Sequence, residues 1–152
     1  MDKWEIYRIF VGKNADYYIE KFKKFEESGG ALSWNWAAFF FGILWVFYRK
    51  MYLYGVLIFL GIILLGVFVA VSSNQILSIG IQLWLWIGFG AFGNYLYYIF
   101  VKKTVSDIQS QAKNEKELIE SLAKKGGTSF LAPILFIILM ILFQIIMIGT
   151  IK

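Results

Sequence analysis

Long apolar runs alternate with charged segments along this chain. Three of the runs, Tyr52 to Val71, Ile79 to Ile99 and Leu131 to Ile151, contain no Asp, Glu, Lys or Arg. A helix needs about 20 apolar residues to cross a hydrocarbon core of about 30 Å, and each run reaches that length. The pattern therefore predicts an all-α membrane protein with three transmembrane helices.

A fourth apolar run, Trp34 to Tyr48, is shorter than the other three. At about 1.5 Å per residue it reaches only about 22 Å along a helix, which is less than the thickness of the hydrocarbon core. By itself the pattern leaves three placements open, because the run can span the membrane, re-enter from one side or lie in the interface.

Basic residues distinguish between these placements. If residues 34–50 form a short re-entrant or interfacial helix, all 15 Lys and Arg residues except Lys152 lie on one side of the membrane. Basic loops tend to stay in the cytoplasm. This rule favours three full spans, with the N-terminus in the cytoplasm and the C-terminus outside.

The first polar segment predicts an amphipathic helix. Tyr18, Phe22 and Phe25 recur at helical spacing on one face. Asn14 can cap this helix, and Gly29-Gly30 directly after Ser28 would end it. We expect such a helix to rest against the membrane or against a second amphipathic helix.

These patterns predict five consecutive parts. The second amphipathic helix is expected from about Thr104 to Lys125. The parts are an amphipathic cytoplasmic region (1–33), the short apolar segment (34–50), two transmembrane helices at 52–71 and 79–99 with a short outer loop (51–100), a cytoplasmic amphipathic helix (101–130) and the third transmembrane helix (131–152).

Composition narrows the chemistry. Of the 152 residues, 59% are hydrophobic and 20% are aromatic, and the mean hydropathy is +0.66. These values exclude an ordinary soluble fold, and the length allows one helical bundle. The chain has no Cys and no His, which removes thiolate nucleophiles, the commonest metal ligand and the commonest general base. We expect no metal site, no cofactor and no carrier that depends on a charge inside the membrane.

Gly88, Gly90 and Gly93 match the G-x-G-x-x-G fingerprint of dinucleotide sites. They lie inside an apolar helix, however, and not between a strand and a helix, so we interpret them as helix-packing residues. Asn94 and Gln144 are uncharged polar residues within the spans, and we expect them to hydrogen-bond between helices. The alternative, that they line a pore in an oligomer, remains open.

An enzyme site would need ionisable groups gathered in one place. The best candidates are Lys13, Asp16, Tyr17 and Glu20. Asp16 and Glu20 share a helix face, and a carboxylate pair can supply acid–base catalysis where burial separates the two pKa values. The solvated start of a helix explains the same residues, and we favour that interpretation. No catalytic residue is therefore assigned.

Basic residues near the ends of the spans predict contact with anionic lipid. A Lys close to the membrane surface attracts anionic headgroups by about 1 kcal/mol. The net charge is +5 and acidic residues are interspersed, so nucleic-acid binding is not expected. The residues assigned to headgroup contact are Lys21, Lys23, Lys24, Lys102, Lys103, Lys124 and Lys125.

The sequence Trp34-Asn35-Trp36 begins the short apolar run. Tryptophan prefers the membrane interface, so Phe39 and Phe40 would enter the hydrocarbon while Arg49 and Lys50 hold the far end on the same side. The segment then acts as a structural anchor or as a docking ridge for a partner. The residues assigned to partner or lipid docking are Trp34, Asn35, Trp36, Phe39, Phe40, Arg49 and Lys50.

Several motifs between Gly12 and Tyr98 occur in a specific combination. They are the Lys-Asn pair after Gly12, the run Ser33-Trp34-Asn35-Trp36-Ala37-Ala38-Phe39-Phe40-Phe41-Gly42, the run Tyr48-Arg49-Lys50-Met51-Tyr52 and the run Gly93-Asn94-Tyr95-Leu96-Tyr97-Tyr98. In this combination the chain resembles the bacterial membrane family Domain of Unknown Function 2628. Members often have Pro soon after the Phe-Phe-Phe-Gly segment, where this chain has Ile43 and Leu44. The resemblance implies a small multi-pass protein of the bacterial cytoplasmic (inner) membrane, with no assigned reaction.

Three functions remain open. The leading hypothesis is a non-enzymatic accessory or assembly subunit, which binds a membrane-protein partner or a second copy of itself through its glycine-rich helix faces and cytoplasmic helices. The second is an oligomeric channel or transporter component. The third is a membrane enzyme acting on lipid or peptide. The absence of His, of Cys and of charge within the spans ranks them in this order.

Overall fold

The computed structural model describes residues 1–72 and 74–150. Every regular element in this part of the chain is a helix, so the predicted all-α fold is confirmed. The helices are α1 (Lys3–Val11), α2 (Ala15–Ser28), α3 (Trp36–Phe41), α4 (Ile43–Tyr48), α5 (Tyr52–Ser72), α6 (Gln75–Gln111), α7 (Glu115–Lys125) and α8 (Leu131–Thr150).

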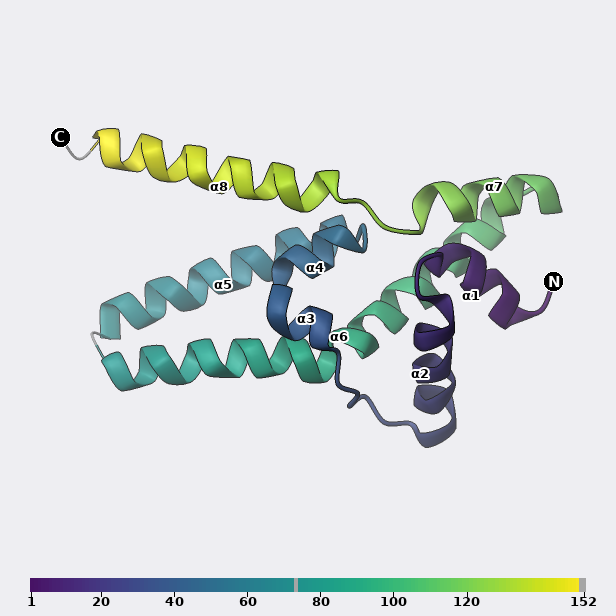
Figure 1. Cartoon of the computed structure of the whole chain (residues 1–152), viewed down its shortest axis with the longest axis horizontal. Coiled ribbons are helices and arrows are strands. Elements are labelled where there is room, and N and C mark those ends of the chain that lie inside the picture. The colour runs from purple at the N-terminus through teal and green to yellow at the C-terminus, as the bar shows by residue number, and fades with distance from the viewer. Residues whose placement is uncertain (73, 151–152) are drawn as a thin grey trace.

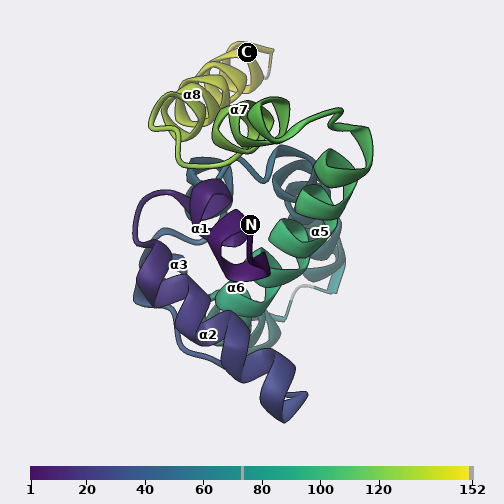
Figure 2. The ribbon, with the colours of Figure 1, turned by 90° about the vertical axis from the view of Figure 1, so that its right-hand side faces the viewer.

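Figure 1 shows that these helices form two parts. α5, the first half of α6 and α8 extend toward one end, whereas α1, α2, α7 and the second half of α6 lie at the other, with α3 and α4 between them. We call the two parts the apolar arm (52–72, 75–92 and 131–150) and the head (3–28 and 93–125). Figure 2 views the head end-on and shows α1 lying among α2, α6 and α7.

The first helix, α1, was not predicted. A capping box starts it, because the N–H of Trp4 donates to the Asp2 side chain and the N–H of Asp2 donates to the Glu5 side chain, both at 3.2 Å. Such a box satisfies two backbone donors that would otherwise lack partners. One face of α1 is buried, with Phe10 and Val11 fully enclosed.

The core of the head is built from aromatic rings. α2 occupies the predicted position and buries Tyr18, Phe22 and Phe25 on one face. The rings of Tyr18 and Phe22 pack against Tyr97 of α6, with centroids 4.9 Å and 5.9 Å apart. Asn14 stands at the predicted N-cap position, but its side chain makes no capping bond and its φ is 61°. These ring contacts position α2 on α6.

One charged residue of α2 lies against this core. The Lys3 ammonium donates to Glu26 Oε1 at 2.5 Å, and the Tyr98 hydroxyl donates to the same oxygen at 2.7 Å. Partial burial favours the protonated form of Glu26, but the bonds from Lys3 and Tyr98 outweigh it and lower its pKa. This clamp joins α1, α2 and α6.

The lowered pKa of Glu26 predicts acid sensitivity of the head. The clamp stabilises the fold fully above the unfolded pKa of glutamate, about 4.3, and the stabilisation is lost as the pH falls through the lower folded value. We expect the midpoint of thermal unfolding to fall below about pH 4.5. A Glu26→Gln variant should lose part of this dependence, whereas Glu5→Gln should keep it. An unchanged pH profile in Glu26→Gln would contradict the assignment.

The short apolar run forms a broken helix. Gly42 adopts φ 49° and ψ −123° between the six-residue helices α3 and α4, a conformation that L side chains rarely adopt. α3 packs against α6, and α4 packs against α5 and α8. A straight span over Trp34 to Tyr48 is therefore excluded.

Two helices are long and apolar enough to cross a membrane by length and composition, Tyr52–Ser72 and Gln75–Gln111. Three were predicted. The third corresponds to α8, a helix of 20 residues, of which Leu131–Ile146 forms an apolar stretch that is by itself shorter than a span. Ile151 and Lys152 lie outside the described residues, as does Ser73 of the predicted outer loop.

The predicted single helix from Thr104 to Lys125 is wrong. α6 continues from the second predicted span through the basic pair at 102–103 to Gln111, and a separate helix, α7, follows. The break arises because the Asn114 side chain accepts from the N–H of Glu117 at 2.9 Å. In return, the Glu117 carboxylate accepts from the N–H of Lys113 at 3.0 Å. Asn114 therefore caps a new helix.

Candidate functional site

A buried amide pair joins α3 to α6 where the head meets the apolar arm. Asn35 is 2% exposed and Asn94 is fully buried. Asn35 Nδ2 donates to Asn94 Oδ1 at 2.8 Å, and Asn35 Oδ1 accepts from the N–H of Ala38 at 2.9 Å. Asn35 thus caps α3 and holds it on α6 with the same side chain.

The other end of the Asn94 amide is also satisfied. Asn94 Nδ2 approaches Tyr17 Oη at 2.9 Å and Ser33 Oγ at 3.1 Å. The Tyr17 hydroxyl donates to the carbonyl of Trp34 at 3.0 Å. Burial raises the pKa of Tyr17 despite its bond to Asn94, so this hydroxyl stays protonated at neutral pH. The cluster contains no ionised acid or base, so its hydrogen bonds serve to hold the segments together.

Two glycines of α6 make this approach possible. A Cβ on Gly93 would lie 2.7 Å from the Ala38 Cβ, and one on Gly90 would lie 2.9 Å from the Trp34 ring. The carbonyl of Gly90 accepts from the N–H of Asn35 at 2.8 Å. Gly88, in contrast, would meet nothing within 4 Å. Gly90 and Gly93 therefore allow α3 to pack closely on α6, and Gly88 takes no part in this contact.

Replacing Asn94 by Leu is expected to cost about 2–3 kcal/mol of unfolding free energy, because the substitution leaves the buried Asn35 amide without its acceptor. The measurement is an SDS titration of protein in dodecyl maltoside micelles, followed by tryptophan fluorescence. Gln82→Leu on the same helix is the control, since Gln82 is exposed. Equal losses in the two variants would contradict the role given to the amide pair.

A buried cation lies next to this cluster. Arg49 is 2% exposed, and its guanidinium carbon lies 4.3 Å from the ring centroid of Tyr18 and 5.1 Å from that of Tyr97. Its Nη1 donates to the carbonyls of Lys13 at 3.1 Å and Val11 at 3.4 Å. The Val11 carbonyl belongs to the C-terminal end of α1, where the helix dipole favours a positive charge, and the Lys13 carbonyl lies in the turn that follows. Arg49 therefore ties α4 to the α1–α2 turn without a carboxylate partner in the described part of the chain.

The structure corrects part of the predicted docking surface. Asn35 and Arg49 were assigned to partner or lipid contact, but both are buried and bonded inside the protein. They were misplaced because a polar residue between aromatic residues gives no local sign of a distant partner. Lys50 donates from Nζ to the carbonyl of Lys124 at 3.2 Å. The remaining residues include Trp36 and Phe40, which are 63% and 67% exposed. Of the others, Trp34 is exposed and Phe39 is half-buried.

The candidate catalytic residues are not brought together. Asp16 pairs with Arg8, Glu20 pairs with Lys24 at 2.8 Å, and Tyr17 belongs to the amide cluster. The hydrogen bond from Lys24 lowers the pKa of Glu20. A carboxyl that acts as a general acid needs a raised pKa, so this arrangement does not suit acid catalysis.

The lysines assigned to anionic headgroups occupy several faces of the head. Lys21 and Lys24 pair with Glu20, and Lys23 lies over the Trp4 ring, with its Nζ 5.5 Å from the centroid. Lys102 lies over the Tyr98 ring at 5.7 Å, and Lys103 is exposed. Lys124 and Lys125 line a hollow of about 610 Å³ together with Lys50.

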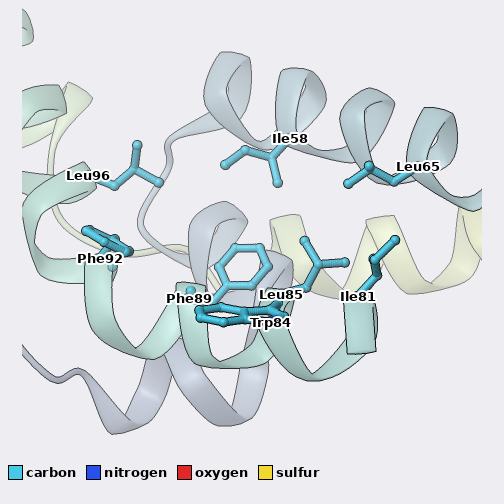
Figure 3. Close-up of a pocket in the computed structure, with 10 residues that line it drawn as sticks. Ile58, Leu65, Ile81, Trp84, Leu85, Phe89, Phe92 and Leu96 are labelled. Carbon is cyan, nitrogen blue, oxygen red and sulfur yellow. The ribbon is translucent and has the colours of Figure 1, made fainter. Parts of the chain in front are cut away.

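The apolar arm contains a cavity of about 550 Å³ between α5 and α6. Figure 3 shows Ile58 and Leu65 of α5 above Leu85 and Phe89 of α6. Gly88 and Gly93 also line the cavity, and all its other lining residues are aliphatic or aromatic. Gln144 lies exposed on α8, which packs on α4 and not on α6, so the structure does not bring it to Asn94.

Sequence reasoning missed the parts of the site that depend on distant contacts. It did not assign Ser33 to the amide cluster, nor the backbone carbonyls that receive Arg49. No local pattern marks these groups, because each is defined by a partner more than thirty residues away. Tyr17 was singled out, but for chemistry that its hydrogen bonds do not support.

Comparison with known proteins agrees with the motifs that build this cluster. The family model described as "Protein of unknown function (DUF2628)" matches residues 10–103, which is more than half of the chain. The matched region contains the short apolar run, both residues of the amide pair and Arg49. No curated protein and no solved structure matches. The chain therefore belongs to the DUF2628 family of proteins of unknown function.

Proposed function

We propose that this chain is a multi-pass protein of the bacterial inner membrane that serves as a non-enzymatic accessory or assembly subunit for another membrane protein. Its N-terminus is cytoplasmic and its C-terminus is outside, as the distribution of basic residues favours. The apolar arm crosses the bilayer, with α8 as the third span. The observation that carries the proposal is that the helices of this arm do not pack extensively against one another.

The arm leaves its apolar surface uncovered. Only 6% of the most apolar stretch of α5 and 11% of that of α6 are buried. α8 packs on α4, and neither α5 nor α8 packs extensively along α6. Figure 1 shows α8 diverging from the other two long helices. Lipid or another protein must cover such a surface, since its exposure to water is strongly unfavourable.

Glycines without neighbours support the view that a protein covers part of the apolar arm. A Cβ at Gly61 or Gly66 of α5, or at Gly80 or Gly88 of α6, would meet nothing within 4 Å. Glycine in a helix interior costs about 1 kcal/mol relative to alanine, so a packing role is expected where it recurs. Small residues let a second transmembrane helix approach closely. Gly55, Gly90 and Gly93 fill this role inside the chain, against Phe47, Trp34 and Ala38. Gly61, Gly66 and Gly80, which lie outside the cavity between α5 and α6, are available to a partner helix.

The competing functions have less support. The bonding of Asn94 inside the amide cluster removes it from the lining of a pore, and the cavity between α5 and α6 has no polar wall. The groups considered for catalysis are dispersed or paired. The uncovered arm suits partner binding better than either alternative.

The test is the composition of the complex released from native membranes into nanodiscs, with an affinity tag on the N-terminus. We expect a stoichiometric foreign membrane protein. Gly66→Leu and Gly80→Leu should each reduce its recovery at least about fivefold without lowering thermal stability, since a Cβ at either position meets nothing within 4 Å. Val67→Phe is the control for added bulk on α5. A lone monomer, or an oligomer of this chain alone, would overturn the accessory role.

A further inference from the structure

A second cavity, of about 450 Å³, lies between the short helices and the start of α8. It falls within the range of small-molecule and cofactor sites, about 300–1,000 Å³. Its walls are mostly apolar, and its one charged residue is Lys13, accompanied by Asn14. The apolar lining is Ala37, Phe41, Leu44, Trp45, Tyr48, Phe130, Pro133, Ile134 and Ile137.

Aromatic contacts hold this cavity open. The rings of Phe47 and Phe136 stack with centroids 4.7 Å apart, and those of Tyr48 and Phe130 meet at 4.9 Å. In addition, the N–H of Ser129 donates to the carbonyl of Tyr48 at 2.8 Å. These contacts fix the start of α8 relative to α4, so the cavity is formed before any ligand binds.

The polar end of the cavity carries an uncompensated positive charge. Lys13 makes no ion pair in the described part of the chain, and its Nζ lies 5.8 Å from the centroid of the Phe130 ring. The nearby carboxylate of Asp16 is paired with Arg8. The Arg49 guanidinium binds the Lys13 carbonyl at 3.1 Å, but Arg49 is buried and does not line the cavity.

Asn14 adds an uncommitted amide at the same end. It stands at the N-cap of α2, yet its side chain makes no capping bond. Its φ of 61° lies in the left-handed region, which non-glycine residues rarely adopt. Lys13 and Asn14, which are adjacent in the chain, thus supply an ammonium and an amide to a lining that otherwise comes mostly from α3, α4 and α8.

We propose that this cavity binds one acyl chain of an anionic phospholipid from the surrounding bilayer, with the lipid phosphate held by Lys13 and Asn14. The inference rests on the membrane placement in the proposed function and does not depend on the accessory role. Charge complementarity carries it, since the unpaired ammonium suits a phosphate. The apolar walls of the cavity suit the acyl chain of the same lipid. The phospholipid therefore places its negative headgroup at Lys13 and Asn14 and one of its acyl chains in the cavity.

Native mass spectrometry tests this proposal. The purified chain is reconstituted in nanodiscs that contain equal amounts of phosphatidylglycerol and phosphatidylcholine, and is then released into detergent. We expect one retained phosphatidylglycerol per chain. Lys13→Glu should lower its retention about tenfold or more, because the substitution reverses a charge at the headgroup. Ala37→Phe should lower it comparably by filling the cavity, and Lys13→Arg should retain the lipid.

Lys116→Glu provides the matched control. It makes the same change in net charge at an exposed lysine of α7 that does not line the cavity, and it should leave retention unchanged. Circular dichroism in the same detergent shows whether each variant is folded. Equal retention of the two lipids, or retention that Lys13→Glu and Ala37→Phe leave unaltered, would overturn the proposal. Displacement by glycerol phosphate, which has no acyl chain, would overturn it too. Because the assay uses the chain alone, loss of the accessory role would not change its result.

Discussion

Arg49→Ala is expected to lower the free energy of unfolding by about 3–4 kcal/mol. The guanidinium carbon lies 4.3 Å and 5.1 Å from the ring centroids of Tyr18 and Tyr97, and a desolvated contact of this kind contributes about 2 kcal/mol. Its removal also deprives the carbonyls of Val11 and Lys13 of a charged donor and leaves a cavity beneath α4. The measurement is an SDS titration in dodecyl maltoside micelles, followed by tryptophan fluorescence.

Two further variants identify the cause of this loss. Arg49→Lys keeps the charge but lacks the planar fork that stacks and donates twice, so we expect a loss of about 2 kcal/mol. Lys103→Ala removes an exposed charge from the head and should change stability by less than about 0.5 kcal/mol. A loss below about 1 kcal/mol in Arg49→Ala would contradict a central role for Arg49.

Gly126→Ala is expected to cost about 3 kcal/mol by separating α7 from α1. An added Cβ would fall on the carbonyl oxygen of Phe10, and would lie 2.7 Å from the Phe10 carbonyl carbon and 2.9 Å from the Leu122 carbonyl oxygen. All of these are backbone atoms, so no side chain can move aside. The shift would break the bond from the N–H of Gly127 to the Phe10 carbonyl, now 2.7 Å.

Hydrogen exchange shows where Gly126→Ala destabilises the protein. In Gly126→Ala the amides of α7 should exchange faster, while those of α2 keep their protection. Gly61→Ala is the matched control, because a Cβ there meets nothing within 4 Å, and it should leave stability unchanged or slightly improved. Unaltered exchange across α7 would mean that the junction of α1 and α7 does not need a glycine.

The long apolar helices could be predicted because their signal is local. Their runs are uninterrupted by charge, and α5 begins at the predicted residue, Tyr52, and ends one residue after Val71. The buried face of α2 was likewise readable from three aromatic residues at helical spacing. The missed helix α1 has only nine residues, and its buried face consists of Ile6, Tyr7, Phe10 and Val11. Short helices owe most of their stability to packing, so their own sequence gives a weaker signal.

The candidate site was less accessible to sequence reasoning. Trp34-Asn35-Trp36 and Asn94 were both singled out, yet nothing local indicates that two amides 59 residues apart share a hydrogen bond. Arg49 illustrates the same difficulty. In sequence it is one of two adjacent basic residues, and only packing places it inside while Lys50 remains partly exposed.

Sequence alone was sufficient for the class of fold, the approximate place of the long helices and the family, because apolar runs, helical spacing and motifs are properties of neighbouring residues. The three-dimensional structure was needed for the broken helix at Gly42, the buried amide pair, the enclosed Arg49 and the cavity beside Lys13. Each of these depends on which distant segments meet. Local sequence constrains the hydrophobic pattern of a helix, whereas the satisfaction of buried polar groups is decided by all the elements packed around them.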